Sequence, residues 1–237
     1  MVNKMDSYRN NAIMAGALFI IATVTNMLGN LSIKPILDAP DYLIQISANE
    51  NLMIIALLLV VISAFASAGI AICLYPILKK YHEALALGSV GFRVMEGMLL
   101  IVGVLGLLSL LTLSQEYVTT GASNASLYQI SGTLLLAVKT WAGQLGVIAF
   151  TTGAMMYYIV FYQSKLVPRW LTGWGFLGAA LSLASAVLVI AGLLSPLSTV
   201  FIVFNLLILV QEMVLAVWLI VKGFNPSVIA SKSSDMG

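Results

Sequence analysis

Six long runs of apolar residues follow one another along the chain, and short segments between them carry most of the charged side chains. A helix needs about 20 apolar residues to cross ~30 Å of hydrocarbon, and each run is long enough to do so. The runs cover residues 11–33, 51–78, 84–114, 130–163, 170–194 and 197–222. We therefore predict an all-α membrane protein, with residues 1–237 forming a single integral membrane domain built as a six-transmembrane-helix bundle. The second, third and fourth runs exceed the minimum length, so their helices are expected to project beyond the lipid.

The basic residues between the runs gather on one side of this predicted arrangement. Lys4 and Arg9 precede the first run, Lys79 and Lys80 follow the second, Lys165 and Arg169 follow the fourth, and Lys222 and Lys232 follow the sixth. Lys34 alone lies in a connection on the opposite side. Because short cytoplasmic loops carry an excess of Lys and Arg, we predict that the N-terminus and the C-terminus are both cytoplasmic.

The composition agrees with a membrane location. Hydrophobic residues make up 61% of the chain and charged residues 8%, and the mean hydropathy is +1.04; about a quarter of a soluble domain is charged. A formal net charge of +2 provides no basic excess for binding nucleic acid. One cysteine and one histidine cannot supply the ligands of a structural zinc or an iron–sulfur cluster. We predict no metal site, no cofactor and no nucleic-acid partner, and expect membrane lipids to surround the protein.

Four ionisable residues remain inside the apolar runs. Arg93 and Glu96 lie in the third run, Lys139 in the fourth and Glu212 in the sixth. Each would cost about 2.5–3.5 kcal/mol at the centre of a membrane helix on insertion scales, so we expect these side chains to face the bundle interior and to find partners. Three neutral polar residues accompany them in the first, fourth and sixth runs: Asn26, Gln144 and Asn205.

Helical spacing and depth group these residues into two layers. Arg93 and Glu96 lie one turn apart on one helical face. A rise of 1.5 Å per residue places Glu96 and Glu212 about 15 Å from the cytoplasmic edge, near the bilayer midplane. We predict a midplane layer of Arg93, Glu96, Gln144 and Glu212 beneath an outer layer of Asn26, Lys139 and Asn205. Such a polar site would be open to the outside.

Three segments of the sequence resemble a known family. They are residues 74–80, which run into 84–88, then residues 90–96, and finally residues 218–224. Together they resemble the bacterial integral membrane family described as domain of unknown function 4386, and the likeness extends over nearly the whole chain. The resemblance implies a six-helix protein of the prokaryotic cytoplasmic (inner) membrane. It implies no activity, because the family has no established one.

Two main hypotheses for the function follow from the intramembrane charges. In the first, the protein is a small transporter or ligand-binding membrane protein, and the charged site takes a small molecule or a proton. Two carboxylates that share a single arginine would leave one of them able to carry a proton. In the alternative, the protein is a non-catalytic membrane partner or assembly factor whose buried charges only pair helices.

An intramembrane enzyme is the third and least supported hypothesis. The chain lacks the usual histidine and cysteine ligands, and no G-x-S-x-G, H-E-x-x-H or P-loop motif is present. An acid and base pair of glutamates would also need a substrate that the sequence does not identify. We therefore predict no catalytic residue, and the sequence indicates no particular oligomeric state.

Overall fold

The computed structural model describes residues 4–120, 125–196 and 198–234, and within them every long element is a helix. The described helices are α1 (Lys4–Leu37), α2 (Tyr42–Ala48), α3 (Glu50–Leu78), α4 (Glu83–Thr120), α5 (Ala125–Ser164), α6 (Arg169–Ile190), α7 (Thr199–Val221) and α8 (Pro226–Ser234). Residue 197, where the sixth predicted run begins, lies outside the described residues. No strand occurs in the described part of the chain.

Six of these helices, α1 and α3 to α7, are long and apolar enough to cross a membrane. The prediction of an all-α, multi-pass membrane protein with six spans is therefore confirmed. The two longest spans, α4 with 38 residues and α5 with 40, extend beyond the predicted runs at the end where they meet. At 1.5 Å per residue, each is close to 60 Å long, about twice the thickness of the hydrocarbon core.

The fifth span ends earlier than its apolar run. The run continues through Leu193 and Leu194, but α6 stops at Ile190 because Gly192 adopts a left-handed backbone conformation, φ 73°. The amide of Gly192 bonds to the carbonyl of Val189, and the amide of Leu193 bonds to the carbonyl of Leu188. This pair of bonds is the Schellman arrangement, which closes a helix even where hydropathy would let it continue.

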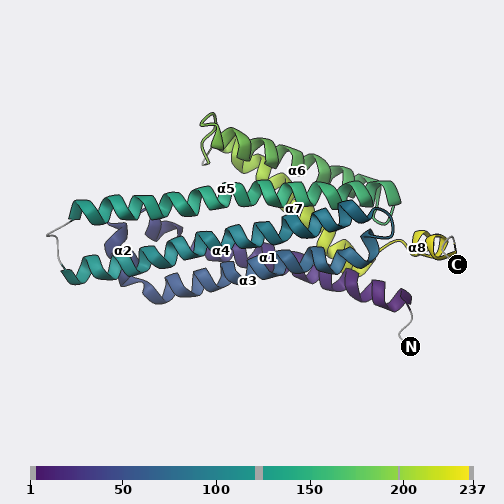
Figure 1. Cartoon of the computed structure of the whole chain (residues 1–237), viewed down its shortest axis with the longest axis horizontal. Coiled ribbons are helices and arrows are strands. Elements are labelled where there is room, and N and C mark those ends of the chain that lie inside the picture. Colours follow the sequence, from purple (N-terminus) through teal and green to yellow (C-terminus); the bar gives the residue numbers. More distant parts are fainter. Residues whose placement is uncertain (1–3, 121–124, 197, 235–237) are drawn as a thin grey trace.

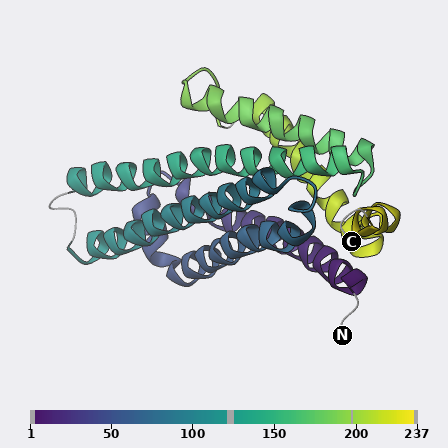
Figure 2. The same cartoon turned by 45° about the vertical axis from the view of Figure 1, so that its right-hand side comes forward.

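The six spans form a closed ring of neighbours. Each packs against two others in the order α1, α3, α4, α5, α6 and α7, and α7 returns to contact α1. Figures 1 and 2 show α4 and α5 side by side, with α6 and α7 diverging from α5 towards the loop that joins them. Arg9 of α1 helps to close the ring, because its guanidinium donates to the carbonyls of Leu219, Ile220 and Val221 at 3.1, 2.6 and 3.3 Å. These carbonyls belong to the last turn of α7, where a cation is favourable.

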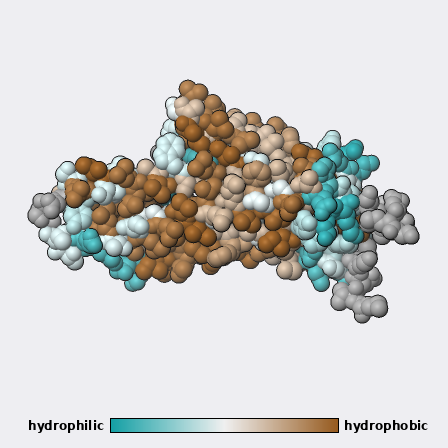
Figure 3. Space-filling view, viewed as in Figure 1, coloured by the Kyte–Doolittle hydropathy of each residue, from teal (hydrophilic) through white to brown (hydrophobic). Residues whose placement is uncertain are grey.

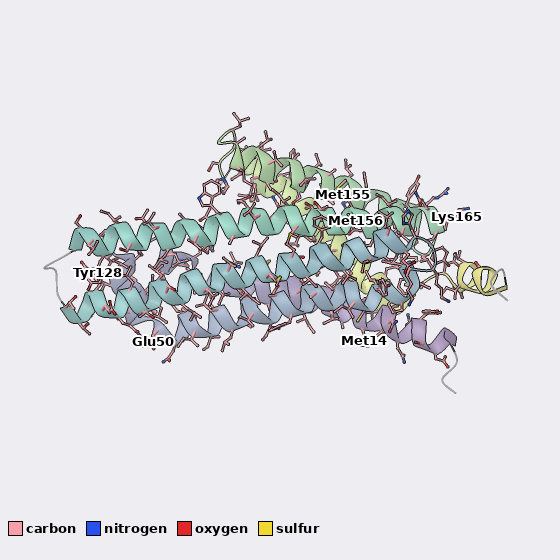
Figure 4. The ribbon with its side chains drawn as sticks, in the orientation of Figure 1. Met14, Glu50, Tyr128, Met155, Met156 and Lys165 are labelled. Carbon is pink, nitrogen blue, oxygen red and sulfur yellow. The ribbon has the colours of Figure 1, made fainter. Side chains whose placement is uncertain are left out.

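The two ends of the bundle differ in charge. The end where α1 begins and α8 lies, here called the basic end, carries Arg9, Lys79, Lys80, Lys165, Arg169 and Lys222. A hydrophilic band covers this end in Figure 3. The opposite end, here called the acidic end, carries Asp38, Asp41, Glu50 and Glu116 beside Lys34. Figure 4 labels Lys165 at the basic end, and Glu50 and Tyr128 towards the acidic end.

A short helix that the apolar pattern did not predict, α2, packs beneath the acidic end. Tyr42, Leu43 and Ile46 of α2 pack with residues of α1, α3 and α4 in an apolar core. The Ser114 hydroxyl of α4 donates to the carbonyl of Leu43, and the Tyr42 hydroxyl donates to the carbonyl of Gln129 at 3.4 Å. α2 therefore fastens the projecting ends of α4 and α5 to the rest of the bundle. The other unpredicted helix, α8, lies at the basic end.

Candidate functional site

Arg93 of α4 is buried inside the bundle, where an apolar environment disfavours a charged side chain. Only 3% of its side chain is exposed. Its guanidinium lies over two aromatic rings, with its central carbon 5.0 Å from the ring centroid of Phe150 in α5 and 5.9 Å from that of Phe19 in α1. Both distances are within the range of a cation–π interaction, which is strongest where water is excluded. The aromatic residues of two neighbouring helices therefore replace part of the hydration of this cation.

Glu96 is the ion-pair partner of Arg93. Its Oε2 lies 3.0 Å from Nη1 of Arg93, one helical turn away on the same face of α4. The Ser67 hydroxyl of α3 donates to the same oxygen at 2.6 Å. This contact requires α3 and α4 to approach closely beside Gly97, because a Cβ there would come within 2.8 Å of the Ala64 carbonyl oxygen. One carboxylate of the site is therefore neutralised and hydrogen-bonded.

Glu212 is the second carboxyl group of the site and has a different environment. It is 8% exposed on α7, and its Oε1 accepts a hydrogen bond of 3.3 Å from the Tyr157 hydroxyl of α5. Among the described residues, no Lys, Arg or His lies within the 4.0 Å ion-pair distance of Glu212. Arg93 acts on it only at longer range. The site thus holds one arginine that is directly paired with one of its two glutamates.

A second chain of hydrogen bonds begins at the residue before Glu212. The Tyr158 hydroxyl donates to Oε1 of Gln211 at 2.5 Å, and Nε2 of Gln211 donates to the Leu171 carbonyl of α6 at 3.0 Å. Tyr158 and Gln211 are both fully buried. These bonds attach α5 and α6 to α7 at the same level as the glutamate.

These contacts involve all six spans. We define the intramembrane cluster as the side chains of Ser67, Arg93, Glu96, Tyr157, Tyr158, Gln211 and Glu212, with the rings of Phe19 and Phe150 against Arg93. The helix α6 takes part through the Leu171 carbonyl. Met155 and Met156, which directly precede the two tyrosines, mark the level of the cluster along α5 in Figure 4. Arg93, Glu96 and Glu212, predicted to share a layer, belong to one cluster.

The other predicted site residues lie elsewhere. Gln144 is buried on α5, but no hydrogen bond links it to the intramembrane cluster, and its Oε1 has no partner among the described residues. Asn26 accepts a hydrogen bond from Asn30 within α1. Asn205 accepts from the Ser182 hydroxyl of α6 at 2.7 Å and donates to that of Ser185 at 3.3 Å.

Lys139 is half-buried on α5 and forms no ion pair within the described part of the chain. It lies nearer to the acidic end along α5 than the two tyrosines of the cluster do. No hydrogen bond or ion pair in the described residues connects Asn26, Lys139 and Asn205 with one another. Asn26, Lys139 and Asn205 therefore lie at three separate places in the bundle.

Sequence reasoning missed the hydroxyl donors of the cluster. Tyr157 and Tyr158 lie in an apolar run, and tyrosine at the end of a span is ordinarily an interfacial residue. Ser67 lies among alanines and reads as a helix-packing residue. The two adjacent tyrosines and the two adjacent polar residues, Gln211 and Glu212, are visible in the sequence. Their pairing is not, because it depends on hydrogen bonds between α5 and α7 that only the fold shows.

The chemical groups of the intramembrane cluster are guanidinium, carboxyl, amide and hydroxyl groups. Among the described residues, no group of three His, Cys, Asp or Glu side chains could hold a metal ion. The cluster offers a fixed cation, one paired carboxylate, one carboxyl group without a salt bridge, and buried hydroxyl donors.

Comparisons with known proteins give a family match. The model of the family described as Domain of unknown function (DUF4386) matches residues 14–223, which is most of the chain. Neither a curated protein nor a solved structure matches the chain significantly.

Proposed function

Because the chain belongs to the DUF4386 family, whose description states no activity, we propose a function from the site itself. The protein is a small transporter or ligand-binding membrane protein whose intramembrane cluster binds one exchangeable positive charge at Glu212. The proton is the smallest such charge, and a small cationic ligand is the other candidate. Arg93 and Glu96 form the fixed part of the site.

The balance of charge in the cluster carries this proposal. Arg93 contributes one positive charge, and Glu96 and Glu212 contribute two negative charges when both are ionised. An unpaired charge in a low-dielectric interior is costly, and such a group tends to take up a proton or a counter-ion. Since Glu96 holds the direct salt bridge with Arg93, the uncompensated charge falls on Glu212. A proton or cation bound there makes the cluster neutral.

Two unsatisfied polar atoms support a binding role. Nε of Arg93 and Oε1 of Gln144 are buried, and neither has a hydrogen-bond partner among the described residues. Buried polar groups are nearly always paired, so the unpaired donor of Arg93 favours a cluster that binds water or a ligand, and the unpaired acceptor of Gln144 favours a second such place on α5. We further propose that the intramembrane cluster is reached from outside the cell.

The alternative function is helix pairing. It is favoured by the participation of all six spans in the intramembrane cluster, because interhelical polar contacts stabilise membrane bundles by modest amounts each. In that case Glu212 would be a permanent partner of Tyr157 and would exchange nothing. The two functions therefore differ in whether Glu212 reacts as a protonatable group in the folded protein.

An apolar carbodiimide tests this difference. Dicyclohexylcarbodiimide enters the bilayer and reacts with protonated carboxyl groups, and mass spectrometry locates the adduct. We expect labelling of Glu212 in the folded protein in lipid nanodiscs, little labelling of the paired Glu96, and no adduct on this peptide in Glu212→Gln. The solvent-facing Glu50 and Glu116 serve as internal controls. Absence of an adduct at Glu212 at every pH that preserves the fold would favour helix pairing.

The location and orientation are also proposals. The family resemblance and the six spans support the prokaryotic cytoplasmic membrane, and the basic end carries six of the described Lys and Arg side chains. By the positive-inside rule, the basic end faces the cytoplasm, and both termini lie there. The acidic end, with α2 and the projecting parts of α4 and α5, then faces outward.

A further inference from the structure

A cavity of about 520 Å³ opens at the basic end, between the α5–α6 connection and the α7–α8 connection. It is distinct from the intramembrane cluster, since the two share no residue. Its walls include Lys165 and Arg169 on one side and Trp218 and Lys222 on the other. The amide of Asn225 donates to the carbonyl of Leu166 at 2.9 Å and fastens the two connections together. The cavity therefore has a defined shape and a volume within the usual range for ligand pockets.

The charges around the cavity all have one sign. Lys165, Arg169 and Lys222 line it, and no acidic residue does. None of these cations forms an ion pair with a described carboxylate; Arg169 instead lies over the Tyr162 ring, 5.1 Å from its centroid. Lys165 also has a left-handed backbone conformation, φ 60°, which is uncommon for a residue with a Cβ. Lys and Arg side chains grouped in this way are typical of sites for phosphate.

An apolar groove continues from this cavity along α7. The groove has a volume of about 460 Å³ and extends from Val210 to Val221, with Val217 among its lining residues. Trp218 and Lys222 line both the groove and the cavity, so the two are continuous. Eleven residues of helix rise about 16 Å, which is close to half of the ~30 Å hydrocarbon core. The length of the groove thus matches an acyl chain in one leaflet, and its apolar surface suits such a chain.

We propose that an anionic phospholipid binds here, with its phosphate among Lys165, Arg169 and Lys222 and one acyl chain along the groove of α7. Free phosphate would match the three cations but would leave the groove unused. The charge of the cavity and the apolar groove that joins it therefore favour the lipid. The site is a specific lipid site of the leaflet at the basic end.

Native mass spectrometry of the purified full chain in detergent tests the proposal. Phosphatidylglycerol is compared with phosphatidylcholine of the same acyl chains, for the wild type and for Lys165→Gln with Lys222→Gln. The matched control is Lys79→Gln with Lys80→Gln, which removes the same charge from the same end. At about fivefold in affinity for each cation, the first double variant should bind phosphatidylglycerol about 25-fold more weakly, and the control should keep the wild-type preference.

A second pair of variants tests the groove. Val217→Trp fills it, whereas Val203→Trp places the same side chain on another exposed position of α7 outside it. We expect Val217→Trp alone to weaken lipid binding, and glycerophosphoglycerol, the headgroup without acyl chains, not to displace the lipid at equal concentration. Equal losses in the two charge variants would overturn the proposal. So would equal losses in the two tryptophan variants, or displacement of the lipid by the free headgroup or by inorganic phosphate.

Discussion

The Tyr157 hydroxyl lies 3.3 Å from Oε1 of Glu212 and donates the hydrogen bond that this carboxyl group receives, while Arg93 is paired with Glu96. This division of partners makes the two glutamates of the cluster inequivalent. Glu96 has a cation and a hydroxyl, and Glu212 has a hydroxyl alone. The properties expected of the site follow from that difference.

Removal of the Tyr157 hydroxyl should weaken the attachment of α5 to α7. In a double-mutant cycle of Tyr157→Phe and Glu212→Leu, we expect a coupling free energy of about 0.6 kcal/mol, the average for interhelical hydrogen bonds in membranes. The measurement is the free energy of unfolding in detergent. Tyr158→Phe, which loses a bond to Gln211 instead, should show less coupling to Glu212→Leu. Equal coupling for the two tyrosines would contradict the hydrogen-bond assignment.

Loss of the arginine charge should destabilise the protein far more than loss of an exposed one. Arg93→Met leaves Glu96 and Glu212 buried without a cation, and breaking a buried pair in this way costs about 3–5 kcal/mol. The control is Lys34→Met, because Lys34 and Asp38 form an exposed pair, with 51% and 62% of their side chains accessible, worth about 0–1 kcal/mol.

Removal of Glu96, the ion-pair partner of Arg93, should restore part of the stability that Arg93→Met loses. Glu96→Gln added to Arg93→Met removes the carboxylate that has lost its ion-pair partner, so part of the unfolding free energy should return. Thermal denaturation of the purified variants measures both effects. If Arg93→Met proves no more destabilising than Lys34→Met, Arg93 is not the central cation of the bundle.

A water-filled route from outside towards the intramembrane cluster should be visible by cysteine labelling. In a Cys73→Ser background, single cysteines at positions 26, 139 and 205 are exposed to a membrane-impermeant maleimide in intact cells. We expect them to react, because each replaces a polar, half-buried residue in the outer part of a span. The matched controls are their exposed apolar neighbours at positions 27, 138 and 206, which should face lipid and stay unlabelled. Resistance at all of the first three positions would contradict a water-filled route from outside towards the intramembrane cluster.

Fusions to reporter proteins test which end of the bundle faces the cytoplasm. Alkaline phosphatase, which is active only outside the cytoplasm, should be active when fused after Thr120 and inactive when fused after the C-terminus. Green fluorescent protein in the same two positions should give the reverse pattern. The reason is the concentration of Lys and Arg at the basic end. Activity of the C-terminal phosphatase fusion would place that end outside.

The six spans could be predicted because hydropathy and length determine them. Their ends could not be predicted as well, since a local backbone feature such as Gly192 stops α6 inside an apolar run. α2 escaped prediction because seven residues give too short a pattern, and its Tyr42 and Leu43 are buried against other helices rather than in lipid.

The charged members of the site were visible in the sequence because Arg93, Glu96 and Glu212 are out of place in lipid. Their partners were not visible, because Ser67 and Tyr157 belong in any membrane helix and gain a role only through packing. The spacing of seven residues puts Asn205 and Glu212 on similar faces of α7, yet the structure joins Asn205 to Ser182 of α6 and Glu212 to Tyr157 of α5. A helical face does not specify which neighbour it meets.

The central claim, that Glu212 exchanges a proton in the folded protein, is tested most directly by infrared difference spectroscopy of the protein in lipid nanodiscs as the pH is changed. The carbonyl band of a protonated carboxyl group in an apolar environment should appear and disappear reversibly in the wild type. The same band should weaken in Glu96→Gln, because Arg93 is then free to balance an ionised Glu212, and it should be absent from Glu212→Gln. Identical spectra for the wild type and Glu212→Gln would contradict the claim and leave helix pairing as the role of the cluster.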